Sequence, residues 1–584
     1  MSSWDLSFFY NSPKDEKIKK DLEESLLATK ELKDKYFERL SDPNLNASEL
    51  KSFFVEYEKI YKKAAFTFQY AHLNYAADTS NEVNQKLNAM CDDYNSKIDM
   101  ELSFWKPVLL KQSEQKLKEF MNSEDLKDYY HVIEKLIKSK HHVLSEDAER
   151  VLAAMYNSSR GGFQDLYERL VNAYEFDIAI DGEIKKLTGP QVRALRRQPD
   201  KELRRRAMKE FFTRYDKDRL VLEKTYNSIV KNYDTEASLR NFKEPISMRN
   251  MNNEVDDEIV KTVIEVTTQR TSMVHKYYKW KAKKLGMDLT LADIYAPMEK
   301  VKKEYTFDEA KKIVLDSYYE FDKEFGDIVN SFFKENRIDS DIRKGKRGGA
   351  FTSYYIPNYK PFILMNFNGN LDDVMTLAHE LGHGIHGTLA SNQNLWNYHP
   401  PLTMAEIASV FGEMLVTDKI LPTLPHEEKT VFIASKIEDM FSTMFRQNMF
   451  ARFEITSHKM ISENGSASWN ELSDLYKEEA KIMFGNSVII PEEYHYEWSS
   501  IPHIFHTPFY VYAYNFANLL VIALYEKYKQ EGKSFVPKYK ELLTNGANDS
   551  PERLLKKLDI DIKEKTFWER GFDFIEREFL NKLD

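Results

Sequence analysis

The sequence predicts a mainly α-helical protein with one small β-sheet. Gly (19) and Pro (18) are scarce among 584 residues and charged residues make up 30%, so we expect long helices with few tight turns. Hydrophobic residues make up 42%, including 37 Phe and 34 Tyr, which is enough to bury a sizeable core and unlike a disordered chain. Two aromatic and β-branched stretches, 350–356 and 362–367, are flanked by Gly or Pro and are typical of strands.

The first third of the chain is predicted to form successive helices, from residue 14 to about 185. Examples are 15–40, 47–77, 81–110 and 124–139. Asn46 with Glu49, and Thr79 with Glu82, match the capping box at a helix start. Turn residues and charges cluster at 187–199, so we divide the chain into an N-terminal helical domain (1–195) and a second domain (196–584).

The next predicted helices carry many charges. Segment 200–217 contains Arg204-Arg205-Arg206, and because both charge signs alternate there, we interpret this run as a solvated face rather than an anion-binding patch. A long helix is expected at 255–284, and the two predicted strands follow.

The strongest chemical signal is the motif His379-Glu380-Leu381-Gly382-His383. Apolar residues around it recur with a helical period, at Val374, Leu377, Ala378, Leu381 and Ile385. Two histidines four residues apart lie on one face of a helix and can bind one Zn²⁺, while Glu380 can hold a metal-bound water and take its proton. The alternative is a helix with incidental histidines, which the regular helical context disfavours.

Glu406 is the predicted third ligand. It lies 23 residues after His383 (406 − 383), in a second expected helix at 404–415 that Pro400 and Pro401 separate from the first. Two His and one Glu with an open fourth position form a catalytic zinc site, here one ion per chain. A closed multi-cysteine site is impossible because Cys91 is the single cysteine.

Other residues near the motif have supporting or no roles. The metzincin pattern is excluded, because His386 stands at its glycine position and Leu389 at its last histidine position. We expect His386 to act in packing or to support a ligand. Glu413, two helical turns past Glu406, is predicted to orient a ligand histidine, with Asp373 as the weaker alternative and a plain solvated carboxylate as the third.

The segments around these residues resemble a known family. HELGHGIH followed by MAEIASVFGE is similar to the thimet-oligopeptidase family of zinc metallopeptidases, in its oligoendopeptidase F branch. The resemblance covers nearly the whole chain and is strongest from about residue 200. The other matching segments are Trp4–Ser7, 345–351, 361–367, 501–503 and 509–514.

The resemblance implies a fold and an activity. The fold would be the large helical zinc-peptidase fold of thimet oligopeptidase and neurolysin, with a small sheet beside the motif helix, a deep substrate channel, and residues 196–584 as the catalytic domain. The activity would be zinc-dependent hydrolysis of internal bonds in short peptides rather than folded proteins. A strand beside the metal, expected at 348–353, would pair its edge with an extended peptide.

A second group of residues, 501–514, contains two histidines and three tyrosines. Peptide hydrolysis passes through an oxyanion that needs donors besides the metal, and imidazole and tyrosine hydroxyl groups are suitable. By resemblance, His503 with Tyr510 and Tyr512 would serve. His506 and Tyr514 remain open, because residues two apart on a helix face different ways. Without the zinc motif such a row of tyrosines would be interpreted as core.

The sequence leaves two alternatives open. The first is a zinc carboxypeptidase or dipeptidyl-type peptidase, for which Arg347 is the residue suspected of holding a terminal carboxylate. The second is a non-catalytic peptide-binding protein, against which the intact Glu380 argues.

Charge and segment composition set the expected location. A net charge of −10 argues against nucleic acid as a partner. The N-terminus lacks a signal-peptide pattern, and the apolar run 519–524 is too short to span a membrane, so we expect a cytoplasmic protein with no membrane partner. The oligomeric state stays open.

Overall fold

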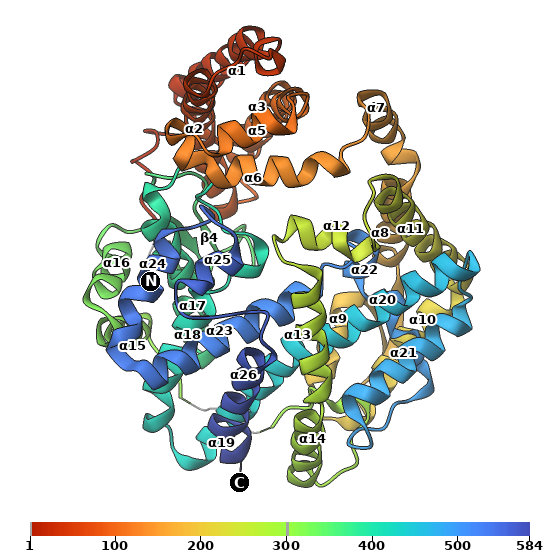
Figure 1. The fold of residues 1–584 in the computed structure, drawn as a ribbon. Helices are drawn as coiled ribbons and strands as arrows, with labels where there is room; N and C mark the ends of the chain where they lie inside the picture. The colour runs from red at the N-terminus through yellow and green to blue at the C-terminus, as the bar shows by residue number, and fades with distance from the viewer. Residues whose placement is uncertain (1–2, 299–302, 584) are drawn as a thin grey trace. The chain divides into compact units, whose positions relative to one another are not determined.

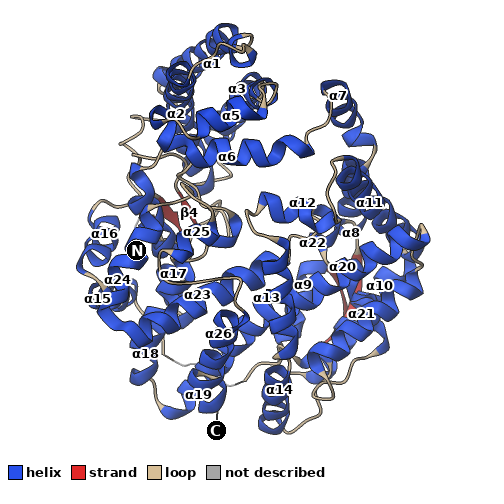
Figure 2. Cartoon of the chain, in the orientation of Figure 1, coloured by secondary structure: helices blue, strands red, loops and turns tan. Residues whose placement is uncertain are grey.

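The computed structural model describes residues 3–298 and 303–583. Helices dominate it and the strands are few and short (Figure 2), which confirms the predicted fold class. The chain forms two compact units. Unit 1 consists of residues 1–141, 303–423 and 527–560, and unit 2 of residues 142–302, 424–526 and 561–584. The division at residue 195 follows the order of the sequence and stays a prediction.

Most elements are helices, labelled along the chain in Figure 1. Unit 1 contains α1 (Glu16–Tyr36), α2 (Ala47–Ala77), α3 (Glu82–Leu102), α4 (Trp105–Leu109), α5 (Glu114–Met121), α6 (Tyr130–Ser139), α15 (Phe307–Phe321), α16 (Lys323–Lys334), α17 (Leu371–Leu389), α18 (Ser409–Ile420), α24 (Phe535–Thr544) and α25 (Pro551–Lys556). Unit 2 contains α7 (Glu146–Met155), α8 (Arg160–Asn172), α9 (Gly189–Ala194), α10 (Lys201–Lys217), α11 (Arg219–Leu239), α12 (Pro245–Asn252), α13 (Asp257–Gln269), α14 (Ser272–Leu285), α19 (His426–Phe441), α20 (Gln447–Asn464), α21 (Trp469–Phe484), α22 (Pro502–His506), most of α23 (Tyr512–Glu531) and α26 (Lys565–Glu578). None of the described helices has the length and apolar content needed to cross a membrane.

The caps of the N-terminal helices explain where the predicted boundaries hold. Helix α2 has the predicted bounds and the predicted capping box between Asn46 and Glu49. The box between Thr79 and Glu82 is wrong. Asn81 caps α3 by accepting from two main-chain N–H groups, while the Thr79 hydroxyl donates to the carbonyl of Gly345, 2.8 Å away. The predicted helix 81–110 accordingly starts one residue late, and it ends early, at Leu102.

A β-hairpin replaces the last predicted helical stretch. Strands β1 (Glu175–Ile180) and β2 (Glu183–Thr188) pair antiparallel across Asp181-Gly182. Both turn residues have positive φ, 54° and 83°, which is the conformation that makes Asp-Gly a favoured two-residue hairpin turn. The helical prediction up to residue 185 is therefore wrong here, and this dipeptide was the signal that pointed to a turn.

The arginine run in α10 is a solvated face only at Arg206, which is exposed. Arg204 is buried and donates from Nε and Nη2 to Asp293 Oδ1, at 3.1 and 2.8 Å. Arg205 donates to the other oxygen of the same carboxylate. Both guanidinium groups are thus committed to one internal acid, which also leaves them unsuited to an external anion. The helix expected at 255–284 is interrupted at Arg270 and Thr271, between α13 and α14.

A three-stranded sheet lies in unit 1 in the order β3-β5-β4. Strands β4 (Phe351–Ser353) and β5 (Phe362–Leu364) are the two predicted strands, shortened, and pair antiparallel. Strand β3 (Ile338–Asp339) pairs parallel with β5 and was missed, since two residues carry no periodicity. Strand β4 is at the edge of this sheet.

Candidate active site

Helix α17 presents the motif residues and is fixed at its start by a capping box. The Asn370 side chain accepts from the N–H of Asp373, and the Asp373 carboxylate accepts from the N–H groups of Asn368 and Asn370, at 2.6 and 3.3 Å. Asp373 therefore serves the helix terminus, where the helix dipole favours a negative charge. It makes no hydrogen bond to a motif histidine among the described residues.

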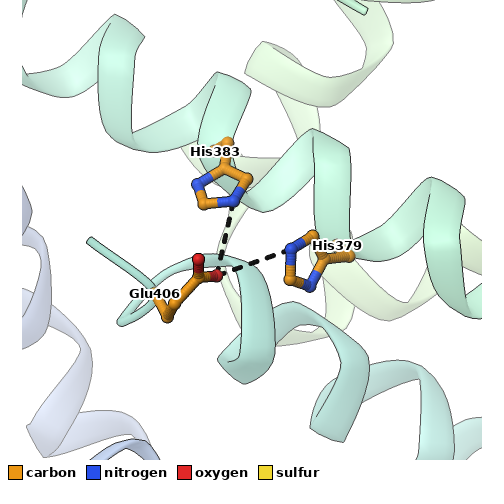
Figure 3. A group of neighbouring side chains, drawn as sticks. All are labelled: His379, His383 and Glu406. Carbon is orange, nitrogen blue, oxygen red and sulfur yellow. Dashed lines mark ion pairs between the residues drawn. The ribbon is translucent and has the colours of Figure 1, made fainter. Parts of the chain in front are cut away.

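The structure brings His379, His383 and Glu406 together. Glu406 Oε2 lies 3.5 Å from His379 Nε2 and 3.4 Å from His383 Nε2, and ligand atoms of all three lie within 4.8 Å of one another. Figure 3 shows both imidazole rings turned toward the Glu406 carboxylate. Nitrogen and oxygen ligands about 2.1 Å from a tetrahedral Zn²⁺ stand roughly 3.4 Å apart, so these donor atoms fit that ion.

Glu406 reaches this group from a turn and not from the predicted helix 404–415. The 3₁₀ helix η8 (Leu402–Met404) precedes it, and α18 begins only at Ser409. The Ser409 hydroxyl bonds to Glu406 Oε2 at 2.5 Å and to its carbonyl oxygen at 3.1 Å. Ser409, the first residue of α18, thus orients the Glu406 carboxylate.

Glu413 contacts one of the two motif histidines. Its Oε1 lies 2.8 Å from His379 Nδ1, so His379 Nδ1–H donates to it and Nε2 is left facing Glu406. The alternative of a plain solvated carboxylate is inconsistent with this contact. Helix α18 comes close enough because Gly382 on α17 has no side chain; a Cβ there would lie 2.4 Å from the carbonyl oxygen of Ala408.

The charges around His379 are strongly coupled. Burial lowers the pKa of His379, but the hydrogen bond to Glu413 and the charges of Glu406 and Glu380 raise it to about 9. Burial raises the pKa of Glu406, yet its contact with His383 and the charge of His379 bring it down to about 2. Three carboxylates around two imidazoles therefore favour positive charge at this point, as a divalent metal would supply.

Glu380 is 6% exposed and is held by a residue that the sequence did not point to. The Thr352 Oγ1 of β4 lies 2.7 Å from Glu380 Oε2 and 2.7 Å from its carbonyl oxygen. Within the described part of the chain no other side chain bonds to this carboxylate. Strand alternation determines the face of β4 on which Thr352 lies. No spacing in the sequence shows that this face contacts α17.

His386 lies outside the ligand group. It is 1% exposed, and neither ring nitrogen has a hydrogen-bond partner within residues 3–298 and 303–583. Burial lowers the pKa of His386 to about 3, so the ring is neutral. This placement agrees with the expected role in packing.

The second predicted group, in unit 2, is only partly assembled. His503 Nε2 lies 3.4 Å from the Tyr514 hydroxyl, and the rings of His503 and Tyr510 lie parallel with centroids 6.0 Å apart. The edge of one tyrosine ring meets the face of the other, Tyr510 against Tyr514, at 5.2 Å. Burial, then the charge of His506, lowers the pKa of His503. His503, Tyr510 and Tyr514 thus form one cluster.

Tyr512 and His506 do not join that cluster. Tyr512 is 2% exposed and its hydroxyl accepts from Asn253 Nδ2 at 2.8 Å, so its ring belongs to the core of unit 2. The rings of His506 and Tyr167 form an edge-to-face pair with centroids 5.8 Å apart. Tyr514, and not the predicted Tyr512, contacts His503. Both tyrosines lie on the first turn of α23, where residues two apart face different ways.

A strained turn precedes Tyr510. Phe509 has φ of 58°, and its N–H donates to Glu454 Oε1 at 2.8 Å, while Arg249 Nε donates to the Pro508 carbonyl at 3.2 Å. Glu454 is fully buried, and burial raises its pKa to about 8. Two internal side chains therefore hold the turn that sets the direction of Tyr510.

Comparison with known proteins identifies relatives along the whole chain. The model of peptidase family M3 matches residues 194–574, and the oligopeptidase F model matches residues 109–176. An oligoendopeptidase F homolog from Borreliella burgdorferi is 31% identical, over 96% of this chain and 94% of the relative. The oligopeptidase PepF of Bacillus subtilis is 28% identical, over 90% of this chain and 79% of the relative.

Solved structures share the fold. A putative peptidase from Chlamydophila abortus superimposes with a TM-score of 0.90 at 24% identity, covering 100% of this chain and 98% of its own. Oligoendopeptidase-F from Enterococcus faecium gives a TM-score of 0.70 at 23% identity, covering 97% and 98%.

Proposed function

The chain belongs to peptidase family M3, and we propose that His379, His383 and Glu406 hold the one Zn²⁺ ion of its active site. It is a metallopeptidase that hydrolyses oligopeptides. Relatives named oligoendopeptidase support cleavage of internal bonds. The observation that carries the metal assignment is the spacing of 3.4 and 3.5 Å between Glu406 Oε2 and the two imidazole nitrogens.

Zinc bound by these ligands would polarise the scissile carbonyl and lower the pKa of a water molecule. Glu380 accepts the proton of the attacking water and returns it to the leaving amine, as a general base that becomes a general acid. Glu413 keeps His379 in the tautomer whose Nε2 is a ligand. The single cysteine, Cys91, is buried in unit 1, and we assign it no part in the reaction.

The edge strand β4 is the proposed binding site for the peptide substrate. One side of β4 pairs with β5, and within the described residues no strand pairs with the other side. An extended peptide that pairs there forms main-chain hydrogen bonds whatever its side chains, which suits an enzyme for varied short peptides.

The oxyanion donors are proposed on the family resemblance. His503 donates with Tyr510 or Tyr514 to the carbonyl oxygen as it gains charge. Tyr514 replaces Tyr512 in this proposal because Tyr512 is buried on Asn253. We also propose residues 196–584 as the catalytic domain, supported by the family match from residue 194, and the cytoplasmic location stays a prediction.

The carboxypeptidase alternative gains no support. Arg347, the residue suspected of holding a terminal carboxylate, packs over the ring of Phe351 at 5.4 Å, and its Nη1 lies 3.3 Å from His72 Nε2. The matched relatives are named for endopeptidase or oligopeptidase activity.

Peptide digestion tests the proposed function. Wild type and Glu380→Gln are incubated with peptides of about 5 to 30 residues, a span that probes the size of the binding site, and products are identified by mass spectrometry with and without a chelator. We expect internal cuts by the wild type, lost with chelator and in the variant, while both proteins bind one zinc ion. Removal of terminal residues alone would overturn the endopeptidase assignment. Full activity of Glu380→Gln would overturn the mechanism.

A further inference from the structure

We propose that Thr352 is a positioning residue for Glu380, which ties the substrate-pairing strand to the catalytic base; this inference rests on the proposed function. The Thr352 hydroxyl lies 2.7 Å from Glu380 Oε2 and 2.7 Å from the Glu380 carbonyl oxygen. The contact joins the middle residue of β4 to the middle of α17. Neither the motif nor its spacing assigns Thr352 a part in the reaction.

The hydroxyl solves a problem of orientation. The terminal torsion of a glutamate is broad, so a carboxylate that must meet a water molecule needs an external contact to hold its plane. A hydrogen bond from a hydroxyl to an ionised carboxylate is stronger than one between neutral groups. Thr352 engages Oε2 and leaves Oε1 as the oxygen without a hydrogen-bond partner in the described chain, available to the attacking water.

The main-chain contact makes the arrangement rigid. The Glu380 carbonyl is part of the helix, and the Thr352 hydroxyl has one proton to share between this oxygen and the carboxylate, which keeps the side chain close to its own backbone. Threonine is stiff at χ1 and suits this task. Glu380 is 6% exposed, so bulk water does not compete strongly for the contact.

Strand alternation gives Thr352 this position. Neighbouring side chains of a strand point to opposite faces, and Ser353 faces α2, where Gln69 Nε2 lies 3.1 Å from its carbonyl oxygen and 3.3 Å from its hydroxyl. Thr352 faces α17 instead. A peptide paired with the edge of β4 therefore contacts the same short strand that holds Glu380. The strand thus fixes the position of the peptide relative to the base.

Steady-state kinetics on a fluorogenic peptide of about nine residues test this inference, a length that spans an extended site. Thr352→Val keeps the shape and removes the hydroxyl, and Thr352→Ser keeps the hydroxyl. Thr388→Val is the matched control, since the Thr388 hydroxyl on α17 donates to the carbonyl of Gly384, at 2.7 Å. Zinc content and thermal unfolding are measured for each variant.

We expect kcat of Thr352→Val to fall about 10- to 100-fold, the range found when a supporting hydrogen bond of a metal site is lost. KM should stay within about twofold and zinc content at one per chain, while Thr352→Ser recovers most of the rate and Thr388→Val keeps it. Wild-type kcat in Thr352→Val would overturn the inference, and so would a loss that serine does not rescue. Glu380→Gln run in parallel separates the claims: if it is inactive while Thr352→Val is fully active, the proposed function stands and only the role of Thr352 fails.

Discussion

At the level of single residues, Glu413 decides which nitrogen of His379 can bind the metal. An imidazole binds a metal through one nitrogen, and the partner of the other nitrogen decides which one that is. Glu413 Oε1 lies 2.8 Å from Nδ1, which assigns Nε2 to the ligand group. The carboxylate also strengthens His379 as a donor, because its charge stabilises positive charge on the ring.

Changing Glu413 to Gln should therefore weaken zinc binding about 10- to 100-fold, since the charge is lost while the size is kept. Competition with a chromophoric chelator measures the affinity. Asp418→Asn is the matched control, because it makes the same change on α18 at a residue that pairs with Lys529. Equal zinc affinity for Glu413→Gln and wild type, or an equal loss in Asp418→Asn, would contradict this role.

Whether a site residue could be predicted from the sequence depends on how close in the chain its partners lie. His379, Glu380 and His383 follow from a local spacing on one helix. Glu413 followed from helical periodicity, although the turn at Glu406 shows that the periodicity was assumed over too long a segment. Thr352 and Asn253 act across long sequence separations, and no local pattern in this chain indicates such contacts.

The crossing of α17 and α18 is the decisive feature at the element scale. Gly382 on α17 lies against the backbone of α18, where an added Cβ would stand 2.4 Å from the Ala408 carbonyl oxygen and 2.5 Å from Ser409 Cα. Backbone atoms cannot move aside as a flexible side chain can. The close approach is what allows residues from α18 and the preceding turn to reach the histidines of α17.

Gly382→Ala should force the two helices apart, at a cost of about 1–3 kcal/mol typical of overpacking. We expect a lower midpoint of thermal unfolding by circular dichroism, together with weaker zinc binding. Gly571→Ala in α26 is the control, because its Cβ would meet the end of the Leu519 side chain, which can move. A Gly382→Ala protein as stable and as zinc-competent as wild type would show that the close crossing is not required.

Elements were predictable where local chemistry and packing agree. Helix α2 has a capping box and no Gly or Pro inside, and its predicted bounds hold. The hairpin β1-β2 was missed although Asp181-Gly182 carries the signal, because the flanking charged residues suit a helix as well. The turn at Glu406 was missed because its apolar pattern continues into α18, and only the contact with α17 decides where that helix starts.

At the scale of the whole molecule, the chain builds its two compact units from separate segments. Each unit takes three stretches of sequence, and the predicted ligands, the base and β4 all belong to unit 1. Such an arrangement follows from long-range packing, so the sequence indicated mainly α structure but not the two units. The family resemblance, in contrast, could be identified from motifs spread over nearly the whole chain.

Unit 1 contains a second group of possible metal ligands, which can be compared with His379, His383 and Glu406. Ligand atoms of His131, Glu134 and Asp549 also lie within 4.8 Å of one another. Arg553 already bonds to both carboxylates, with Nη1 3.0 Å from Glu134 Oε1. The guanidinium occupies oxygens of both carboxylates that a metal would need, so we expect no metal there.

Anomalous diffraction at the zinc edge, from crystals of the zinc-loaded wild-type protein, shows directly whether His379, His383 and Glu406 bind the ion. We predict one strong anomalous peak per chain, bounded by His379 Nε2, His383 Nε2 and Glu406 Oε2 at about 2.0–2.2 Å. A peak at His131, Glu134 and Asp549, or none beside Glu406 in catalytically active crystals, would contradict the proposed zinc site.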